Sequence, residues 1–85
     1  MTASEPAQRI LAFIRQELLE ENAQVDADTS LFRRQLLDSM SLTSVIAFLE
    51  DEFQVRIGAM EIVYENLDTV NSMVAFIERK RAQRS

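Results

Sequence analysis

The hydroxyl of Ser39, directly after Asp38, is the side-chain group of this sequence that is best placed for chemistry. The pair stands where a polar connection gives way to an amphipathic segment, so either residue could simply cap a helix. The same position also suits a covalent attachment, because the first amides of a helix lack internal partners and carry partial positive charge that favours a phosphate ester. The sequence supplies no base to activate the hydroxyl, so a separate enzyme would have to make the bond.

The absence of histidine and cysteine excludes several other kinds of site. Without cysteine there can be no disulfide and no thiol nucleophile, and without either residue no typical zinc site. A catalytic serine–histidine pair is excluded as well. We therefore expect no metal site in this chain and no enzyme activity of its own.

The length and the charge of the chain limit what it can bind. Its 85 residues predict one domain, 1–85, with an ordered core over about 5–80 and a basic tail over 79–85. The net charge is −5, and residues 1–78 carry five basic and fourteen acidic groups, a net of −9. This body should repel nucleic acid and attract basic protein surfaces. There is no apolar run long enough for a membrane span and no signal peptide, so we expect a cytoplasmic protein.

The elements that must position Ser39 are predicted to be helices, because the chain has one glycine and one proline. The first helix should run from about Glu5 to Glu21, with Ser4 as its cap. A connection over 22–37 follows, pinned by apolar side chains: Leu31, Phe32, Leu36 and Leu37. A second helix over Ser39–Phe53, a short third over Ala59–Tyr64 and a last one starting at Asp68 or Thr69 complete the pattern.

Helical spacing predicts which faces are buried. The apolar stripes are Ile10, Leu11, Ile14 and Leu18 in the first helix, Leu42, Val45, Ile46, Leu49 and Phe53 in the second, and Val70, Met73, Val74 and Ile77 in the last. Met40 points about 160° away from the second stripe and should be exposed. Ile62 and Val63 should pack the short helix, which Gly58 precedes as a possible hinge; this segment is either a gate for cargo or a plain connector. Three further rings, Phe13, Phe48 and Phe76, lie off the strict stripes and should line the core edge or a cargo cavity.

Four segments resemble acyl and peptidyl carrier proteins: Thr29-Ser30-Leu31-Phe32, Leu36-Leu37-Asp38-Ser39-Met40, Phe48-Leu49-Glu50-Asp51-Glu52-Phe53 and Asn66-Leu67-Asp68-Thr69-Val70. The resemblance extends from about residue 8 to residue 80. It implies an all-α fold, a small four-helix bundle of carrier-protein type. It also implies that a phosphopantetheinyl transferase, using magnesium, attaches 4′-phosphopantetheine from coenzyme A to Ser39. Asp38 would help the transferase to recognise the site, and the thiol of the arm would carry an acyl or aminoacyl group as a thioester.

Departures from the commonest carrier pattern indicate the subtype. Gln35 stands where carriers with this spacing usually have glycine, and Met40 replaces leucine. The run Leu-Leu-Asp-Ser-Met resembles D-alanyl carrier proteins and related discrete carriers. Fatty-acid-synthase carriers usually have acids two and five residues after the serine, where this chain has Ser41 and Ser44. We therefore expect a discrete, monomeric carrier for a specialised pathway, loaded by a separate adenylating ligase and emptied by a downstream transferase or synthase.

We expect these residues to meet partner enzymes: Leu37 and Met40 beside the serine, the acidic cluster Glu50, Asp51 and Glu52, and the pair Arg33 and Arg34, which is unusual for a carrier. The charged groups could equally be solvated surface. Two alternatives for the whole chain stay open: a carrier of fatty or polyketide chains, and a helical interaction module without a prosthetic group. The sequence does not identify the cargo.

Overall fold

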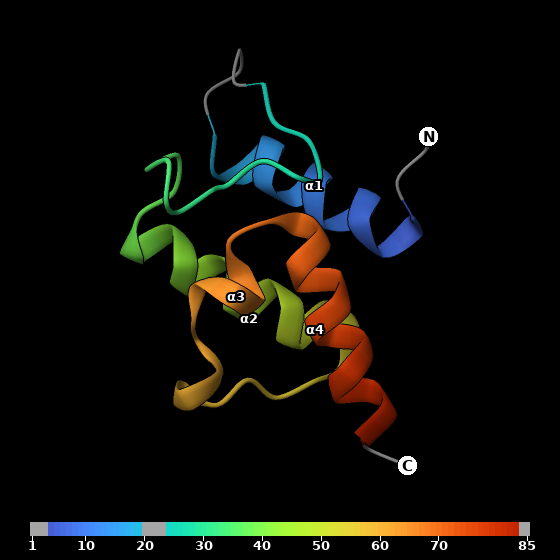
Figure 1. Ribbon diagram of the computed structural model, residues 1–85. Helices are drawn as coiled ribbons and strands as arrows, with labels where there is room; N and C mark the ends of the chain where they lie inside the picture. Colours follow the sequence, from blue (N-terminus) through green and yellow to red (C-terminus); the bar gives the residue numbers. More distant parts are fainter. Residues whose placement is uncertain (1–3, 20–23, 84–85) are drawn as a thin grey trace.

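The computed structural model describes residues 4–19 and 24–83, and in these ranges every regular element is a helix (Figure 1). The α-helices are α1 (Glu5–Glu17), α2 (Ser39–Phe53), α3 (Tyr64–Leu67) and α4 (Val70–Gln83), and a 3₁₀ turn, η1 (Ala59–Glu61), lies between α2 and α3. The predicted all-α class and the carrier-type arrangement of four helices are therefore confirmed. None of the described helices is long and apolar enough to cross a membrane.

The helices enclose one core. α4 packs against α1 and α3, and residues 24–37 of the connection pass over one end of the molecule before the chain enters α2 (Figure 1). The buried members of the predicted stripes are Ile10, Leu11, Ile14, Val45, Leu49, Phe53, Val70, Met73 and Ile77. Leu18, Leu42, Ile46 and Val74 are only partly buried. The helical spacing therefore predicted correctly which face of each helix meets the core. It overestimated only how deeply the residues at the edges of these faces are buried.

The three aromatic rings outside the stripes divide into two environments. Phe76 is buried in the core, where the stripe of α4 did not place it. Phe13 of α1 and Phe48 of α2 are partly buried and stack on each other with 4.2 Å between ring centroids. The core-edge interpretation is thus correct for Phe13 and Phe48. None of the three lines the cleft beside Ser39, so a cargo cavity formed by these rings is not found there.

The first helix is shorter than predicted. Ser4 caps it as expected, because its hydroxyl accepts a hydrogen bond from the Ala7 amide at 3.4 Å. The helix ends at Glu17, where the amides of Leu18 and Leu19 both donate to the Ile14 carbonyl. This sharing closes the last turn and turns the two leucines toward the core. The predicted end at Glu21 is wrong, although residues 20–23 themselves lie outside the described ranges.

The short third helix is divided in two. The prediction of one helix over Ala59–Tyr64 is wrong, because Ile62 leaves the turn and Val63 is extended (φ −135°, ψ 157°). Both are β-branched, which favours extended backbone. They are 36% and 45% exposed, so they do not pack the segment as expected. Leu67 of α3 supplies the buried contact instead.

The last helix begins at Val70, slightly later than predicted. Thr69 precedes it, and its hydroxyl accepts a hydrogen bond from the Ser72 amide at 2.9 Å, as a cap does. Lys80 and Arg81 lie in the last turn, where the negative end of the helix dipole favours them. Asp68 is excluded from the helix and is buried at the α3–α4 junction.

Candidate functional site

Ser39 is the first residue of α2, and Asp38 is its cap. The Asp38 carboxylate accepts a hydrogen bond from the Ser41 amide at 2.9 Å, and the Asp38 carbonyl accepts one from Leu42. Asp38 therefore performs the capping role that either residue could have filled. The Ser39 side chain is exposed, and within the described residues its hydroxyl makes no hydrogen bond. It is sterically accessible to another molecule.

The start of α2 carries a negative charge, which the sequence analysis did not take into account. Hydrogen bonds from the Ser41 amide, and then from the Ser41 hydroxyl, hold the pKa of Asp38 below its ordinary value. The carboxylate is therefore ionised at neutral pH and already occupies part of the positive end of the helix dipole. A phosphate ester on Ser39 would share the first turn with this negative charge. The electrostatic stabilisation of a phosphate ester at this helix start is consequently weaker than the helix dipole alone would give.

An open cleft of about 680 Å³ begins at Ser39. One side is formed by the end of the long connection and the start of α2, and the other by the segment around α3. Its lining is Phe32, Gln35, Leu37, Asp38, Ser39, Leu42, Ile62, Val63, Tyr64 and Leu67. This volume lies in the range of small-molecule sites. A flexible arm joined to the Ser39 hydroxyl would have an apolar groove at its base, so these residues fit such a group.

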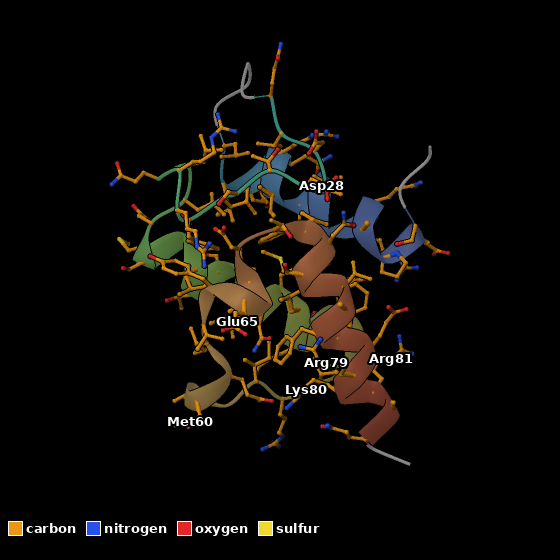
Figure 2. The ribbon with its side chains drawn as sticks, viewed as in Figure 1. Asp28, Met60, Glu65, Arg79, Lys80 and Arg81 are labelled. Atoms are coloured by element: carbon orange, nitrogen blue, oxygen red, sulfur yellow. The ribbon has the colours of Figure 1, made fainter. Side chains whose placement is uncertain are left out.

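The two apolar residues beside Ser39 have opposite environments. Met40 is 82% exposed, as the helical phase predicted. Leu37 is 4% exposed, so its role as a pin of the connection is confirmed, and its predicted role as a direct partner contact must be corrected. Leu31 is buried beside it, whereas Leu36 is 36% exposed and is not a buried pin. Met60 on η1, which the sequence did not single out, is 92% exposed (Figure 2).

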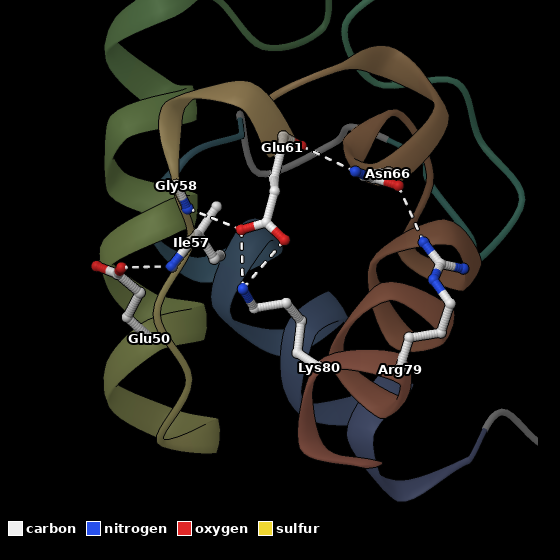
Figure 3. Close-up of polar contacts among 7 residues, drawn as sticks. All are labelled: Glu50, Ile57, Gly58, Glu61, Asn66, Arg79 and Lys80. Carbon is white, nitrogen blue, oxygen red and sulfur yellow. Dashed lines mark hydrogen bonds and ion pairs between the residues drawn. The ribbon is translucent and has the colours of Figure 1, made fainter. Parts of the chain in front are cut away.

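The acidic cluster Glu50, Asp51 and Glu52 lies at the opposite end of α2. Eleven to thirteen residues separate it from Ser39, which is about 17–20 Å along a helix axis. Glu50 accepts a hydrogen bond from the Ile57 amide at 2.9 Å (Figure 3), and Glu52 forms an ion pair with Arg9 at 3.0 Å. Two of the three carboxylates therefore have structural contacts, and none adjoins Ser39.

The two arginines before the motif also differ. The guanidinium of Arg33 lies 5.2 Å from the ring centroid of Tyr64, and its Nε lies 3.8 Å from the Asp68 carboxylate. Arg33 therefore links the connection to α3 on the far side of the cleft, although its side chain remains 60% exposed. Arg34 is exposed and lies beside a separate hollow on the α1 side. Partner selection by either arginine stays a prediction.

Glu61 is a contact centre that the sequence analysis missed. Its carboxylate accepts hydrogen bonds from the Gly58 amide at 2.8 Å and from Lys80 of α4 at 2.8 and 3.0 Å (Figure 3). Asn66 donates to the Glu61 carbonyl and accepts a hydrogen bond from Arg79. The hydrogen bond from Lys80 is the main reason that the pKa of Glu61 is lowered. These polar contacts add to the burial of Leu67 in tying the cleft wall to α4.

The signal for Glu61 was present in the sequence. A glutamate three residues after Gly58 is spaced to accept a hydrogen bond from the amide at the start of a helical turn. Asp68 gave no comparable local signal, because its partners are 35 to 38 residues away.

Comparison with known proteins gives consistent matches. Residues 8–77 match a protein family described as "Phosphopantetheine attachment site". The chain is 40% identical over 58 residues to a probable acyl carrier protein, PigG, of Serratia sp. (strain ATCC 39006), which covers 68% of this chain and 67% of the relative. It is 24% identical over 75 residues to the D-alanyl carrier protein of Abiotrophia defectiva, covering 88% and 95% of the two chains. The family match includes Ser39 and every residue that lines the cleft.

Proposed function

This chain belongs to the phosphopantetheine-attachment family of carrier proteins, and we propose that it is a discrete carrier whose arm is attached to Ser39. The cofactor of the protein is covalently bound 4′-phosphopantetheine. The group supplies a flexible arm with a terminal thiol, which compensates for the absence of cysteine from the chain. The alternative of an interaction module without a prosthetic group is therefore rejected.

One observation carries the assignment of the arm to Ser39. Asp38 makes the capping hydrogen bond, so the Ser39 hydroxyl is left exposed at the mouth of an apolar cleft. In this arrangement Ser39 offers the oxygen and Asp38 holds the helix start and faces the transferase. A phosphopantetheinyl transferase, acting with magnesium, carries out the attachment.

The subtype is a finer part of the proposal. The D-alanyl carrier relative aligns over most of both chains, and the serines at 41 and 44 stand where fatty-acid-synthase carriers usually have acids. We infer a specialised pathway in which a separate adenylating ligase loads an amino acid or a small carboxylic acid. A downstream transferase or synthase then receives it, and the whole sequence takes place in the cytoplasm. Met40, exposed beside Ser39, is the proposed partner contact.

Mass spectrometry tests the attachment. The purified chain is incubated with coenzyme A, magnesium and a broad-specificity transferase, and we expect a mass increase of one phosphopantetheinyl group. Ser39→Ala should show no increase, whereas Ser44→Ala, an exposed serine of the same helix, should be modified like the unchanged chain. Lack of modification in the unchanged chain would refute the proposal, and modification of Ser39→Ala would move the attachment to another residue.

A loading assay tests the subtype. The modified chain is offered to adenylating ligases with amino acids or small acids, and to fatty-acyl and polyketide loading enzymes in parallel. A thioester, detected by its mass, should form with the adenylating ligases and the amino acids or small acids. Efficient loading by the fatty-acyl or polyketide loading enzymes alone would show that the chain carries fatty or polyketide chains instead.

A further inference from the structure

Asp68 is the one charged side chain that is buried within residues 4–19 and 24–83; it is 7% exposed. It lies at the junction between α3 and α4, where it ends α3. Burial of a carboxylate is costly unless hydrogen bonds compensate for the lost water. The position of Asp68 therefore calls for a structural or functional reason.

The groups that donate hydrogen bonds to Asp68 all come from one turn of the long connection. Its carboxylate accepts hydrogen bonds from the Ser30 hydroxyl, from the Phe32 amide at 2.8 Å and from the Arg33 amide at 3.1 Å. Its carbonyl accepts a fourth, from the Leu31 amide at 2.7 Å. A single residue thus holds residues 30–33 through both its side chain and its backbone.

The turn formed by residues 30–33 also holds the last residues before Ser39 through hydrogen bonds. The Leu31 carbonyl accepts hydrogen bonds from the amides of Leu36 at 2.9 Å and Leu37 at 3.0 Å. The Phe32 carbonyl accepts one from Gln35 at 3.1 Å. The connection consequently folds back on the turn that Asp68 holds, and it ends at Leu37, next to the capping residue of α2. Continuous hydrogen bonding leads from Asp68 to the start of the helix that bears Ser39.

The charge on Asp68 is maintained by this geometry. Burial by itself raises the pKa of Asp68, but the hydrogen bonds from Ser30, Arg33 and Phe32 and the charge of Arg33 outweigh it and leave the pKa below its ordinary value. Removal of the carboxylate would leave the two backbone amides without their acceptor. The buried Leu31 side chain would still anchor the turn to the core. The turn should therefore stay attached to the core but lose its shape.

We propose that Asp68 is a positioning residue for the attachment serine: it fixes residues 30–37 in the form that presents Ser39 at the mouth of the cleft. The inference rests on the proposed function, because it concerns the rate at which a transferase modifies Ser39. Asp68 touches neither the arm nor Ser39. It acts through the backbone of the connection.

Steady-state kinetics of phosphopantetheinyl transfer test this role. Asp68→Ala should lower kcat/KM by about 10- to 100-fold, the loss expected when a reacting group is displaced by about 1 Å. The loss should appear mainly in kcat, since Met40 and the surrounding surface are unchanged. Asp68→Asn keeps one acceptor oxygen for the two amides and should recover most of the rate, as a conservative rescue.

A matched control separates positioning from general loosening of the connection. Asp28 also joins the connection to α4, because it accepts a hydrogen bond from the Asn71 side chain at 2.5 Å, but its contact lies earlier in the connection (Figure 2). Asp28→Ala should leave kcat/KM within about twofold, because an exposed contact of this kind contributes little to the fold. Rates are normalised to the folded fraction measured by circular dichroism.

Hydrogen exchange keeps the test decisive if Asp68→Ala does not fold. In Asp68→Asn and Ser30→Ala, the amides of residues 31–37 should exchange faster while those of Val45–Leu49 keep their protection. An unchanged kcat/KM in folded Asp68→Ala, or an equal loss in Asp28→Ala, would overturn the inference. So would unchanged exchange of residues 31–37 in the two milder variants. If the unchanged chain accepts no arm at all, the proposed function fails instead, so the two failures are distinguishable.

Discussion

Gln35 adopts a left-handed backbone conformation, with φ 63°, in the connection just before Ser39. A non-glycine residue there costs roughly 1–2 kcal/mol because its Cβ crowds the following carbonyl. Glycine avoids this cost, but it loses about 0.5–1 kcal/mol more through the entropy of the unfolded chain. Gln35→Gly should therefore stabilise the protein by about 0.5 kcal/mol. The Gln35 side chain is exposed and makes no side-chain hydrogen bond to the described residues, so its removal should add no further cost.

Gln16→Gly is the matched control, because Gln16 is exposed and lies in the right-handed backbone of α1. There the substitution should destabilise by about 0.5–1 kcal/mol, the ordinary cost of glycine in a helix. The two variants should consequently differ by about 1–1.5 kcal/mol, with opposite signs relative to the unchanged chain.

Urea denaturation and thermal melts measure the difference. For a chain of 85 residues the entropy of unfolding is about 180 cal/mol/K, so Gln35→Gly should raise Tm by about 3 °C and Gln16→Gly should lower it by about 3–5 °C. The denaturant slope m should stay constant, because neither substitution changes much of the surface that unfolding exposes. Equal losses of stability in both variants would show that Gln35 is not strained and that the reasoning is wrong.

Three further predictions concern the partner surface, the cleft wall and pH. Met40→Glu should change stability by less than about 0.5 kcal/mol but slow arm transfer or loading, because Met40 is exposed beside Ser39; a large fall in Tm with unchanged transfer would contradict this. Lys80→Ala should speed hydrogen exchange over residues 57–67 while α2 keeps its protection, because it removes the Glu61–Lys80 ion pair; Arg81→Ala, on the same helix, should not, and equal exchange in the two variants would leave the segment a plain connector. The folded pKa of Asp68 is lowered, so its contribution to stability is present above about pH 4 and is lost as the pH falls through the folded value. The free energy of unfolding, measured by urea denaturation between pH 3 and 6, should accordingly vary less with pH in Asp68→Asn than in the unchanged chain. The same pH dependence in both chains would refute this role of the Asp68 carboxylate.

The sequence by itself determined the elements that depend on neighbours along the chain. Helical periodicity placed Val45 and Leu49 in the core and Met40 outside it, because side chains three or four residues apart share one face of a helix. The Asp38-Ser39 pair at a helix start also belongs to this class, since the preference of aspartate for the cap is local. The family resemblance added the identity of the cofactor, which no contact within the chain could reveal.

The tertiary structure alone decided the features that depend on distant partners. Ile62 and Val63 have apolar side chains, yet they lie at an exposed break, because Glu61 pairs with Lys80 and Leu67 takes the buried position. The sequence offered Leu36 and Leu37 alike as pins, and only Leu37 is buried, because the connection folds back on Leu31. Asp68 looks like an ordinary surface aspartate until residues 30–33 are brought to it. These outcomes were hidden because burial and hydrogen bonding between separate segments follow no periodic pattern, and only the packed molecule brings the partners together.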